Sequence, residues 1–387
     1  MKNINVNSFT AITLFLIFAA CNQPSTVSSK NQTSDTVKTQ IKDSATLARE
    51  KLNDIANFIA GLPVDKSSFL YDYTQTPEWN DYATNSKISW ARFDSVALKY
   101  RSFSLSEIQA PYDTVKTLFY PFAGPDFLFA NIMFPHVEKM ILIGLEAPGD
   151  VPKIDSTLRD SLKKVLNLYT KSLEDVIQLS FFRTIDMKTE LANSSINGIT
   201  PIIMLFLARS NKEIIKVSPQ YLDQNGDLKN VRDSKKVRQA DATEIQYQDK
   251  GDGKIKKVIY LSTNLADPAL SKNLPFMAYL KNIDNHVVTF VKSATYLMHK
   301  SYFSIIRNTC LNKSLLILQD DSGIGFKYFD KEKWKIILYG SYKKPIKLFE
   351  DFYEQDYFDA FKNGHPKPLN FRIGYSPKSN LLMAIKK

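Results

Sequence analysis

Short apolar runs that alternate with helical segments constrain the fold of this chain more than any other feature. From residue 117 onward, runs of strand length are separated by turns and by segments with helical spacing. These runs are 117–122, 139–146, 213–222, 287–291, 314–319 and 334–339. Such alternation favours a sheet covered by helices on both faces. We predict an α/β fold with a mixed, mostly parallel sheet, similar in architecture to Rossmann and methyltransferase folds.

Other segments complete the predicted architecture. The turn at 249–253 predicts a hairpin between 245–247 and 257–261. An apolar stripe predicts a long amphipathic helix after Pro152. The run 199–208 fits a helix or a strand, and we predict a helix because the turn that follows it precedes another strand. At the C-terminal end, 370–375 and 381–385 predict an antiparallel pair at a sheet edge.

The domain organisation follows from changes in composition along the chain. Residues 1–20 have the basic start, apolar run and small residues of a lipoprotein signal peptide. Residues 21–45 contain few large apolar side chains, so we predict a flexible tether. The spacing of apolar residues predicts a helical N-terminal region over 46–116, and 117–387 is the predicted α/β domain.

Cys21 is the predicted site of lipidation and sets the predicted location. A signal of this kind is cut before the cysteine, whose thiol carries a diacylglycerol and whose new amino group is often acylated, for example with palmitate. A secretory signal cut after small residues is the alternative. The apolar run is shorter than the ~20 residues of a membrane span, so membrane lipid is reached through acylated Cys21. Asn22 in place of Asp favours the outer membrane over the inner membrane.

Charge and cysteine content exclude several classes of function. The net charge is +11, but acidic residues interrupt the most basic stretch, 229–257, so we expect no nucleic-acid binding. With Cys21 lipidated, Cys310 has no disulfide partner, and its apolar neighbours predict a buried, unreactive thiol. The four histidines are far apart and no Cys-x-x-Cys pair occurs, so we expect no metal site.

The first candidate ligand-binding residues follow two neighbouring predicted strands. Gly124 and Asp126 lie in a turn that opens a helix, and Glu146 follows Gly124 by 22 positions. A turn at a helix N-terminus and an acid about 20 residues later resemble a nucleotide-binding arrangement. However, one glycine stands where two or three are expected, and Asp126 places negative charge where a phosphate would bind. The alternative is a structural turn with a helix cap.

The other candidate residues are Asp320, Asp321 and Ser322, at the end of the run 314–319. Ligands bind outside the carboxyl ends of strands in open α/β sheets, so this position suits a site. Adjacent carboxylates on a strand point to opposite faces, but both can converge on a hydroxylated ligand or a cation once the strand ends. A solvated loop is the alternative. Ser322 lacks the Gly-x-Ser-x-Gly elbow of a hydrolase nucleophile.

Four stretches resemble an uncharacterised family of bacterial lipoproteins and exported proteins. They are Tyr-Pro-Phe-Ala-Gly-Pro-Asp-Phe-Leu-Phe-Ala at 120–130, Gly-Leu-Glu-Ala-Pro-Gly at 144–149, Gln-Asp-Asp-Ser-Gly at 319–323, and the segment 293–300. The resemblance spans roughly 50–387. Ala147 and Gly325 depart from the prolines usual at these positions. The resemblance implies an exported protein and assigns no catalytic residue.

These observations lead to two functional hypotheses. The first is a cell-envelope lipoprotein that serves as a binding or envelope-interaction module, whose ligand is an envelope glycan or a small molecule. The alternative is an exported enzyme with a degenerate methyltransferase-like or hydrolase-like site. We expect no cofactor, because nucleotide cofactors are scarce outside the cytoplasm. The sequence does not determine the oligomeric state.

Overall fold

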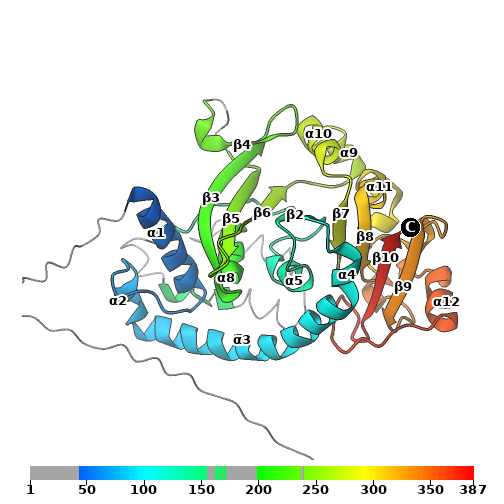
Figure 1. Cartoon of the computed structure of the whole chain (residues 1–387), viewed down its shortest axis with the longest axis horizontal. Coiled ribbons are helices and arrows are strands. Elements are labelled where there is room, and N and C mark those ends of the chain that lie inside the picture. Colours follow the sequence, from blue (N-terminus) through cyan, green and yellow to red (C-terminus); the bar gives the residue numbers. More distant parts are fainter. Residues whose placement is uncertain are drawn as a thin grey trace, which may run out of the picture. The chain divides into compact units, whose positions relative to one another are not determined.

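The computed structural model describes residues 43–154, 162–164, 166–167, 169–170, 198–235, 237 and 239–387. Contacts divide the chain into Met1–Lys42 and one compact unit, Asp43–Lys387. The unit's described elements are shown in Figure 1. The predicted signal peptide, Cys21, nearly all of the predicted tether and most of the helix expected after Pro152 lie outside the described residues.

A ten-stranded mixed sheet crosses the compact unit (Figure 1). Its strands are β1 Thr117–Tyr120, β2 Lys139–Gly144, β3 Lys212–Leu222, β4 Leu228–Asn230, β5 Ala242–Asp249, β6 Ile255–Ser262, β7 Val287–Val291, β8 Ser314–Gln319, β9 Trp334–Gly340 and β10 Asn380–Lys386. They are arranged in the order β4-β3-β5-β6-β2-β1-β7-β8-β10-β9. The predicted α/β class and all six predicted strands are confirmed.

The prediction of a mostly parallel sheet is wrong. Only the neighbouring strands β6, β2, β1, β7 and β8 run parallel. Every pair on either side of this group is antiparallel. The reason is that short turns join β3 to β4 and β5 to β6, and β5 returns beside β3; short turns connect antiparallel strands, whereas parallel strands need a longer crossover. The predicted hairpin is present as β5 and β6.

The C-terminal antiparallel pair is present with a different partner. β10 lies between β8 and β9 and is antiparallel to both. The segment 370–375 was expected to pair with it but forms no strand. Tyr100 Oη donates a hydrogen bond to the Arg372 carbonyl, and Tyr375 Oη donates one to the Ser293 carbonyl at 2.6 Å. These contacts hold the segment across the end of the sheet, away from its edge.

Helices cover both faces of the sheet. One set comprises α1 Ser44–Ile59, α2 Tyr71–Thr74, α3 Pro77–Phe103, the π-helical turn η1 Ser104–Ile108, α4 Gln109–Tyr112, α5 Phe127–Met133 and α8 Thr200–Arg209. The other comprises α9 Asp267–Leu270, α10 Leu274–Asn282, α11 Ser304–Lys313, the 3-10 segment η6 Lys347–Phe352 and α12 Gln355–Asn363. The helix predicted over 199–208 is confirmed as α8. Among the described residues, no helix has both the length and the apolar character needed to cross a bilayer.

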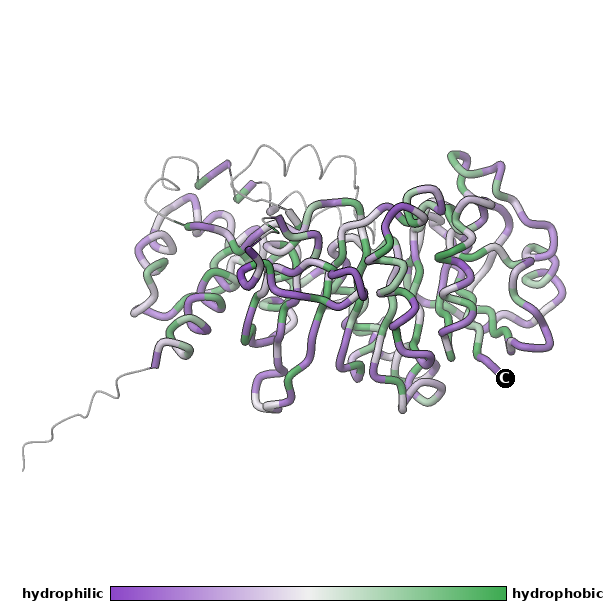
Figure 2. The backbone as a smooth tube through the Cα atoms, turned by 90° about the horizontal axis from the view of Figure 1, so that it is seen from above, coloured by the Kyte–Doolittle hydropathy of each residue, from purple (hydrophilic) through white to green (hydrophobic). Residues whose placement is uncertain are grey.

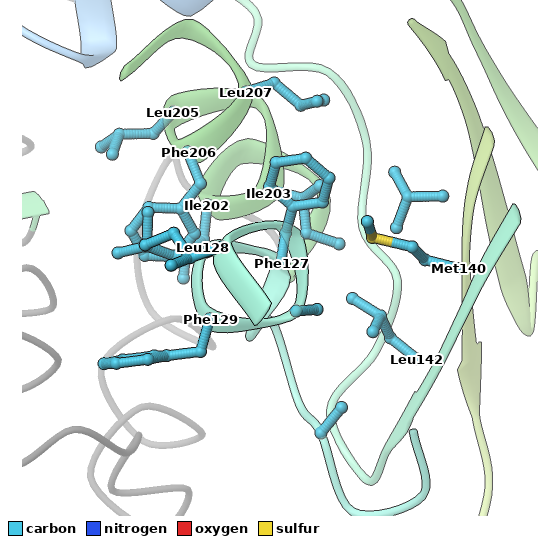
Figure 3. Packing of buried hydrophobic residues seen from close by; sticks show 14 of the residues in the cluster. Phe127, Leu128, Phe129, Met140, Leu142, Ile202, Ile203, Leu205, Phe206 and Leu207 are labelled. Atoms are coloured by element: carbon cyan, nitrogen blue, oxygen red, sulfur yellow. The ribbon is translucent and has the colours of Figure 1, made fainter. Parts of the chain in front are cut away.

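The alternation of side chains along the strands produces two hydrophobic cores. On β1, Leu118 and Tyr120 join the core beneath α1, α3, α5 and α8, whereas Phe119 joins the core beneath α9 to α12. Figure 3 shows the first core, where Phe127 of α5 lies among side chains of α8 and β2. The Phe129 ring of α5 packs against Phe93 and Tyr100 of α3. Burial on both faces explains the nearly continuous apolar strands, visible as green segments through the sheet in Figure 2.

Candidate functional site

All six candidate ligand-binding residues lie at the carboxyl edge of the parallel strands. Gly124 and Asp126 follow β1, Glu146 follows β2, and 320–322 follow β8. β7 lies between β1 and β8, and the chain order of the strands reverses between β1 and β7. Such a reversal is where ligands bind in open α/β sheets. The fold therefore brings these residues to the edge where the sequence predicted a site.

Asp126 forms a buried ion pair with Lys292, the residue that follows β7. Their side chains are each 2% exposed, and Lys292 Nζ lies 2.8 Å from Asp126 Oδ2. The same carboxylate accepts hydrogen bonds from Tyr120 Oη at 2.8 Å and from the Phe129 amide at 3.2 Å. Asp126 is therefore the N-cap of α5 as well as the partner of Lys292. Burial raises the pKa of Asp126, and Lys292 opposes that rise.

Asp320 and Ser322 connect the end of β8 to the end of β7. Asp320 Oδ1 accepts hydrogen bonds from the Ser322 amide at 3.0 Å and the Ser322 hydroxyl at 2.5 Å. Asp320 Oδ2 accepts one from the Ser293 amide at 3.0 Å. The Ser322 hydroxyl also accepts one from the Ala294 amide at 2.7 Å. This turn is buried and bonded on every side, so the prediction of a solvated loop, the alternative for this segment, is wrong.

Asp321 has partners of its own and faces a different direction. It accepts hydrogen bonds from the hydroxyl of Tyr296 and from Asn380 Nδ2, the latter at 3.0 Å. Burial raises the pKa of Asp321. Burial and the charge of Asp321 together raise the pKa of Asp320 to about 7. The two carboxylates share no described hydrogen-bond donor, so they do not converge on one point.

Gly124 and Glu146 lie together at the ends of β1 and β2. The Gly124 amide donates to the Ile143 carbonyl at 3.2 Å, and Gly124 has a φ of 54°. Glu146 Oε2 accepts hydrogen bonds from the Leu145 amide at 3.1 Å and from Tyr260 Oη at 3.3 Å. Glu146 is 5% exposed. The alternative interpretation, a structural turn with a helix cap and an acid bound to neighbouring groups, accounts for each of these contacts.

Sequence reasoning missed the residues that follow β7. Ser293, Thr295 and Tyr296 have φ values of 51°, 53° and 54°, and Phe122 after β1 has 61°. Left-handed backbone at residues other than glycine costs free energy and clusters at functional sites. The Ser293 hydroxyl is buried without a hydrogen-bond partner. The segment 293–300 belongs to the resemblance, but no residue type within it indicates this geometry.

A pocket of about 370 Å³ lies elsewhere in the unit, and no candidate residue lines it. Its lining includes Trp90, Asp94, Arg209 and Lys250. Within the described ranges, no group of three or more His, Cys, Asp or Glu residues is arranged to hold a metal ion. Cys310 is confirmed as a buried free thiol, and burial raises its pKa to about 12, which leaves it protonated and unreactive.

Comparison with protein-family models gives no match, and comparison with curated proteins gives none either.

Proposed function

We propose that the chain is a cell-envelope lipoprotein, anchored through acylated Cys21, whose α/β body serves as a binding or interaction module without catalysis. The observation that carries this proposal is the ion pair of Asp126 and Lys292, 2.8 Å apart and 2% exposed. It lies at the edge of the sheet where enzymes with open α/β sheets hold a cofactor or substrate. Outer-membrane attachment and a glycan or small-molecule ligand belong to the same proposal.

The internal hydrogen bonds of the carboxylates support a non-catalytic role. A catalytic acid or base must reach a reacting atom directly or through one water. Asp126 and Asp320 are 1% and 0% exposed. Asp126 accepts two hydrogen bonds and pairs with Lys292, and Asp320 accepts three hydrogen bonds, all from the protein's own groups. A substrate would have to displace these donors. Removing partners from a buried carboxylate costs several kcal/mol, on the order of 3–5.

The test of a non-catalytic role is metabolite profiling on the body, residues 43–387. The body is incubated with an envelope and metabolite extract, and mass spectrometry follows both retained and consumed compounds. We expect compounds to be retained without being consumed, with the same result for Asp320→Asn. Consumption of a compound by the wild-type body that Asp320→Asn abolishes would contradict the proposal.

The alternative is an exported enzyme with a methyltransferase-like or hydrolase-like site, and two observations favour it. Counted along the chain, the five parallel strands have the order 3-2-1-4-5, as in doubly wound nucleotide-binding sheets. Residues with left-handed backbone and the Asp320 carboxyl, whose pKa is raised to about 7, also lie at the carboxyl edge of the parallel strands. On this alternative Asp320 acts as the acid or base, and Gly124, Glu146 and Ser322 shape the site.

The proposed anchor has a separate test. Replacing Cys21 with Ser removes the thiol that would carry the lipid. We expect the wild-type chain to stay in the membrane fraction after alkaline or high-salt washing. We expect the Cys21→Ser variant either to be soluble or to keep its signal peptide. Cys310→Ser is the matched control and should fractionate as wild type, because that thiol is buried in the body. A Cys21→Ser variant that is cleaved like wild type and stays in the washed membrane fraction would rule out lipid attachment at this residue.

A further inference from the structure

The outward side of α3 carries exposed isoleucine and leucine side chains, separated by small residues, that face away from the core. The buried residues of α3 include Trp79, Trp90 and Tyr100. On the opposite side, Ile88, Leu98 and Leu105, the last in η1, are 49%, 63% and 61% exposed. With Ala91, Ser95 and Ser102, which are also exposed, they form the outer stripe: Ile88, Ala91, Ser95, Leu98, Ser102 and Leu105. Spacings of three and four residues place all six on one helical face.

Basic side chains flank the outer stripe on both sides. Arg92 and Lys99 lie along one flank, and Lys87 and Arg101 lie along the other, as helical spacing requires. All four are exposed, and none forms an ion pair with another described residue. Asp94 is the one acidic residue among the exposed positions from 87 to 106. The face therefore combines exposed leucines and isoleucine with an excess of positive charge.

We propose that the outer stripe and its basic flanks rest on an anionic phospholipid surface. A helix lies in the membrane interface when an apolar face is bordered by Lys and Arg, and anionic headgroups attract those cations. In Figure 1, α3 runs as one long helix along the side of the unit. A single long helix exposes the whole face at once to a flat surface. The inward aromatic face is already buried, so α3 stays packed on the body when its outer face is in contact with lipid.

The charge pattern favours lipid over a second copy of the chain. Two such helices packed against each other would bring basic flanks together, and like charges at these positions repel. Headgroups of opposite sign remove this repulsion. The proposal rests on the proposed envelope location. Cys21, the proposed anchor, precedes Asp43 by only 22 positions, so an anchored chain keeps the compact unit within reach of the membrane. At ~3.5 Å per residue, 22 fully extended residues reach no more than about 77 Å.

The test is cosedimentation of residues 43–387 with vesicles, which omits Cys21 and so measures this face independently of the anchor. This fragment is the compact unit defined by internal contacts. We expect at least tenfold stronger partitioning onto phosphatidylcholine vesicles that contain a quarter phosphatidylglycerol than onto phosphatidylcholine alone. We also expect 500 mM NaCl to reverse the difference, because salt screens exposed charges.

Two double variants separate the apolar and the basic contributions. Leu98→Gln with Leu105→Gln should reduce partitioning at least fivefold, and Arg92→Glu with Lys99→Glu should reduce it at least tenfold. The matched controls are Leu274→Gln with Leu348→Gln, whose leucines are 69% and 79% exposed on other elements. Lys331→Glu with Lys335→Glu is the control for charge. Both controls should stay within twofold of wild type.

Two outcomes would overturn the proposal. One is partitioning that does not depend on anionic lipid. Partitioning that is unchanged both in the leucine variant and in the Arg92 and Lys99 variant counts equally, provided that their unfolding temperatures are close to wild type. The other is a dimer in sedimentation velocity that the Leu98 and Leu105 changes dissociate, which would assign the face to a second copy. In either case the Cys21→Ser fractionation still decides the anchor separately.

Discussion

At the scale of single residues, Lys292 is the side chain that organises the carboxyl edge. Its ammonium group binds Asp126 and lies 4.4 Å from the centre of the Phe129 ring. Transfer of two charges from water costs several kcal/mol per ion, which a close pair offsets only with further hydrogen bonds. Tyr120 and the Phe129 amide supply such bonds to Asp126. The pair therefore fixes the end of β7 against the start of α5.

Residue types predicted some of this edge and missed the rest. Asp126 was identified because it lies in a turn that opens a helix, and the competing interpretation of that turn was a helix cap. Lys292 was not, because a lysine after an apolar strand usually extends into solvent. Its partner lies 166 positions earlier in the chain and is brought near only by the pairing of β1 with β7. Such long-range contacts leave no local pattern in a single sequence.

At the scale of elements, the segment 370–375 shows how a close approach prevents strand formation. It reads as a strand, but Gly374 has a φ of 76°, and a Cβ there would collide with the Asp320 carboxylate. A left-handed glycine breaks the extended backbone, and the missing side chain lets the segment pass over the end of β8. β10 therefore pairs with β9 in its place.

This contact predicts a difference between two glycine substitutions. Gly374→Ala should destabilise the unit by about 3 kcal/mol or more, because left-handed strain and a collision with Asp320 both apply. Gly253→Ala has a similar φ of 70° and no atom within 4 Å of the added Cβ, so it should cost only about 1–2 kcal/mol. Urea unfolding of both variants measures the difference. Equal losses would show that Gly374 does not pack against Asp320.

At the scale of the whole molecule, local patterns predicted most elements and missed much of their pairing. The strands β1, β2, β7 and β8 are apolar on both faces and were recognised from that feature alone. The antiparallel pairing of β3 with β5 was missed, because strand order depends on which strands bury one another's faces. α10 and α12 were also missed, because each is only nine residues long and gives too few turns for a helical repeat to stand out.

The stability of the whole unit should decrease as pH rises from 6.5 to 8. Burial and the charge of Asp321 raise the folded-state pKa of Asp320 from its ordinary range near 4 to about 7. A raised carboxyl pKa means that the folded state binds the proton more tightly, so its stabilisation is lost as pH rises through 7. The pKa of His299 is lowered from 6.5 to about 4, so its contribution raises stability with pH mainly below 6.5, and the remaining rise of about 0.4 kcal/mol above pH 6.5 is smaller than the loss from Asp320.

The expected loss from Asp320 between pH 6.5 and 8 is about 1 kcal/mol, since one pKa unit corresponds to about 1.36 kcal/mol. Urea unfolding at intervals of half a pH unit measures it. Asp320→Asn should be less stable overall, because amide hydrogens replace acceptor lone pairs, and its stability should show only the small rise with pH that His299 contributes. Asp252→Asn, at an exposed position, should retain the wild-type slope. A wild-type profile parallel to that of Asp320→Asn would mean that Asp320 is already ionised at pH 6.5.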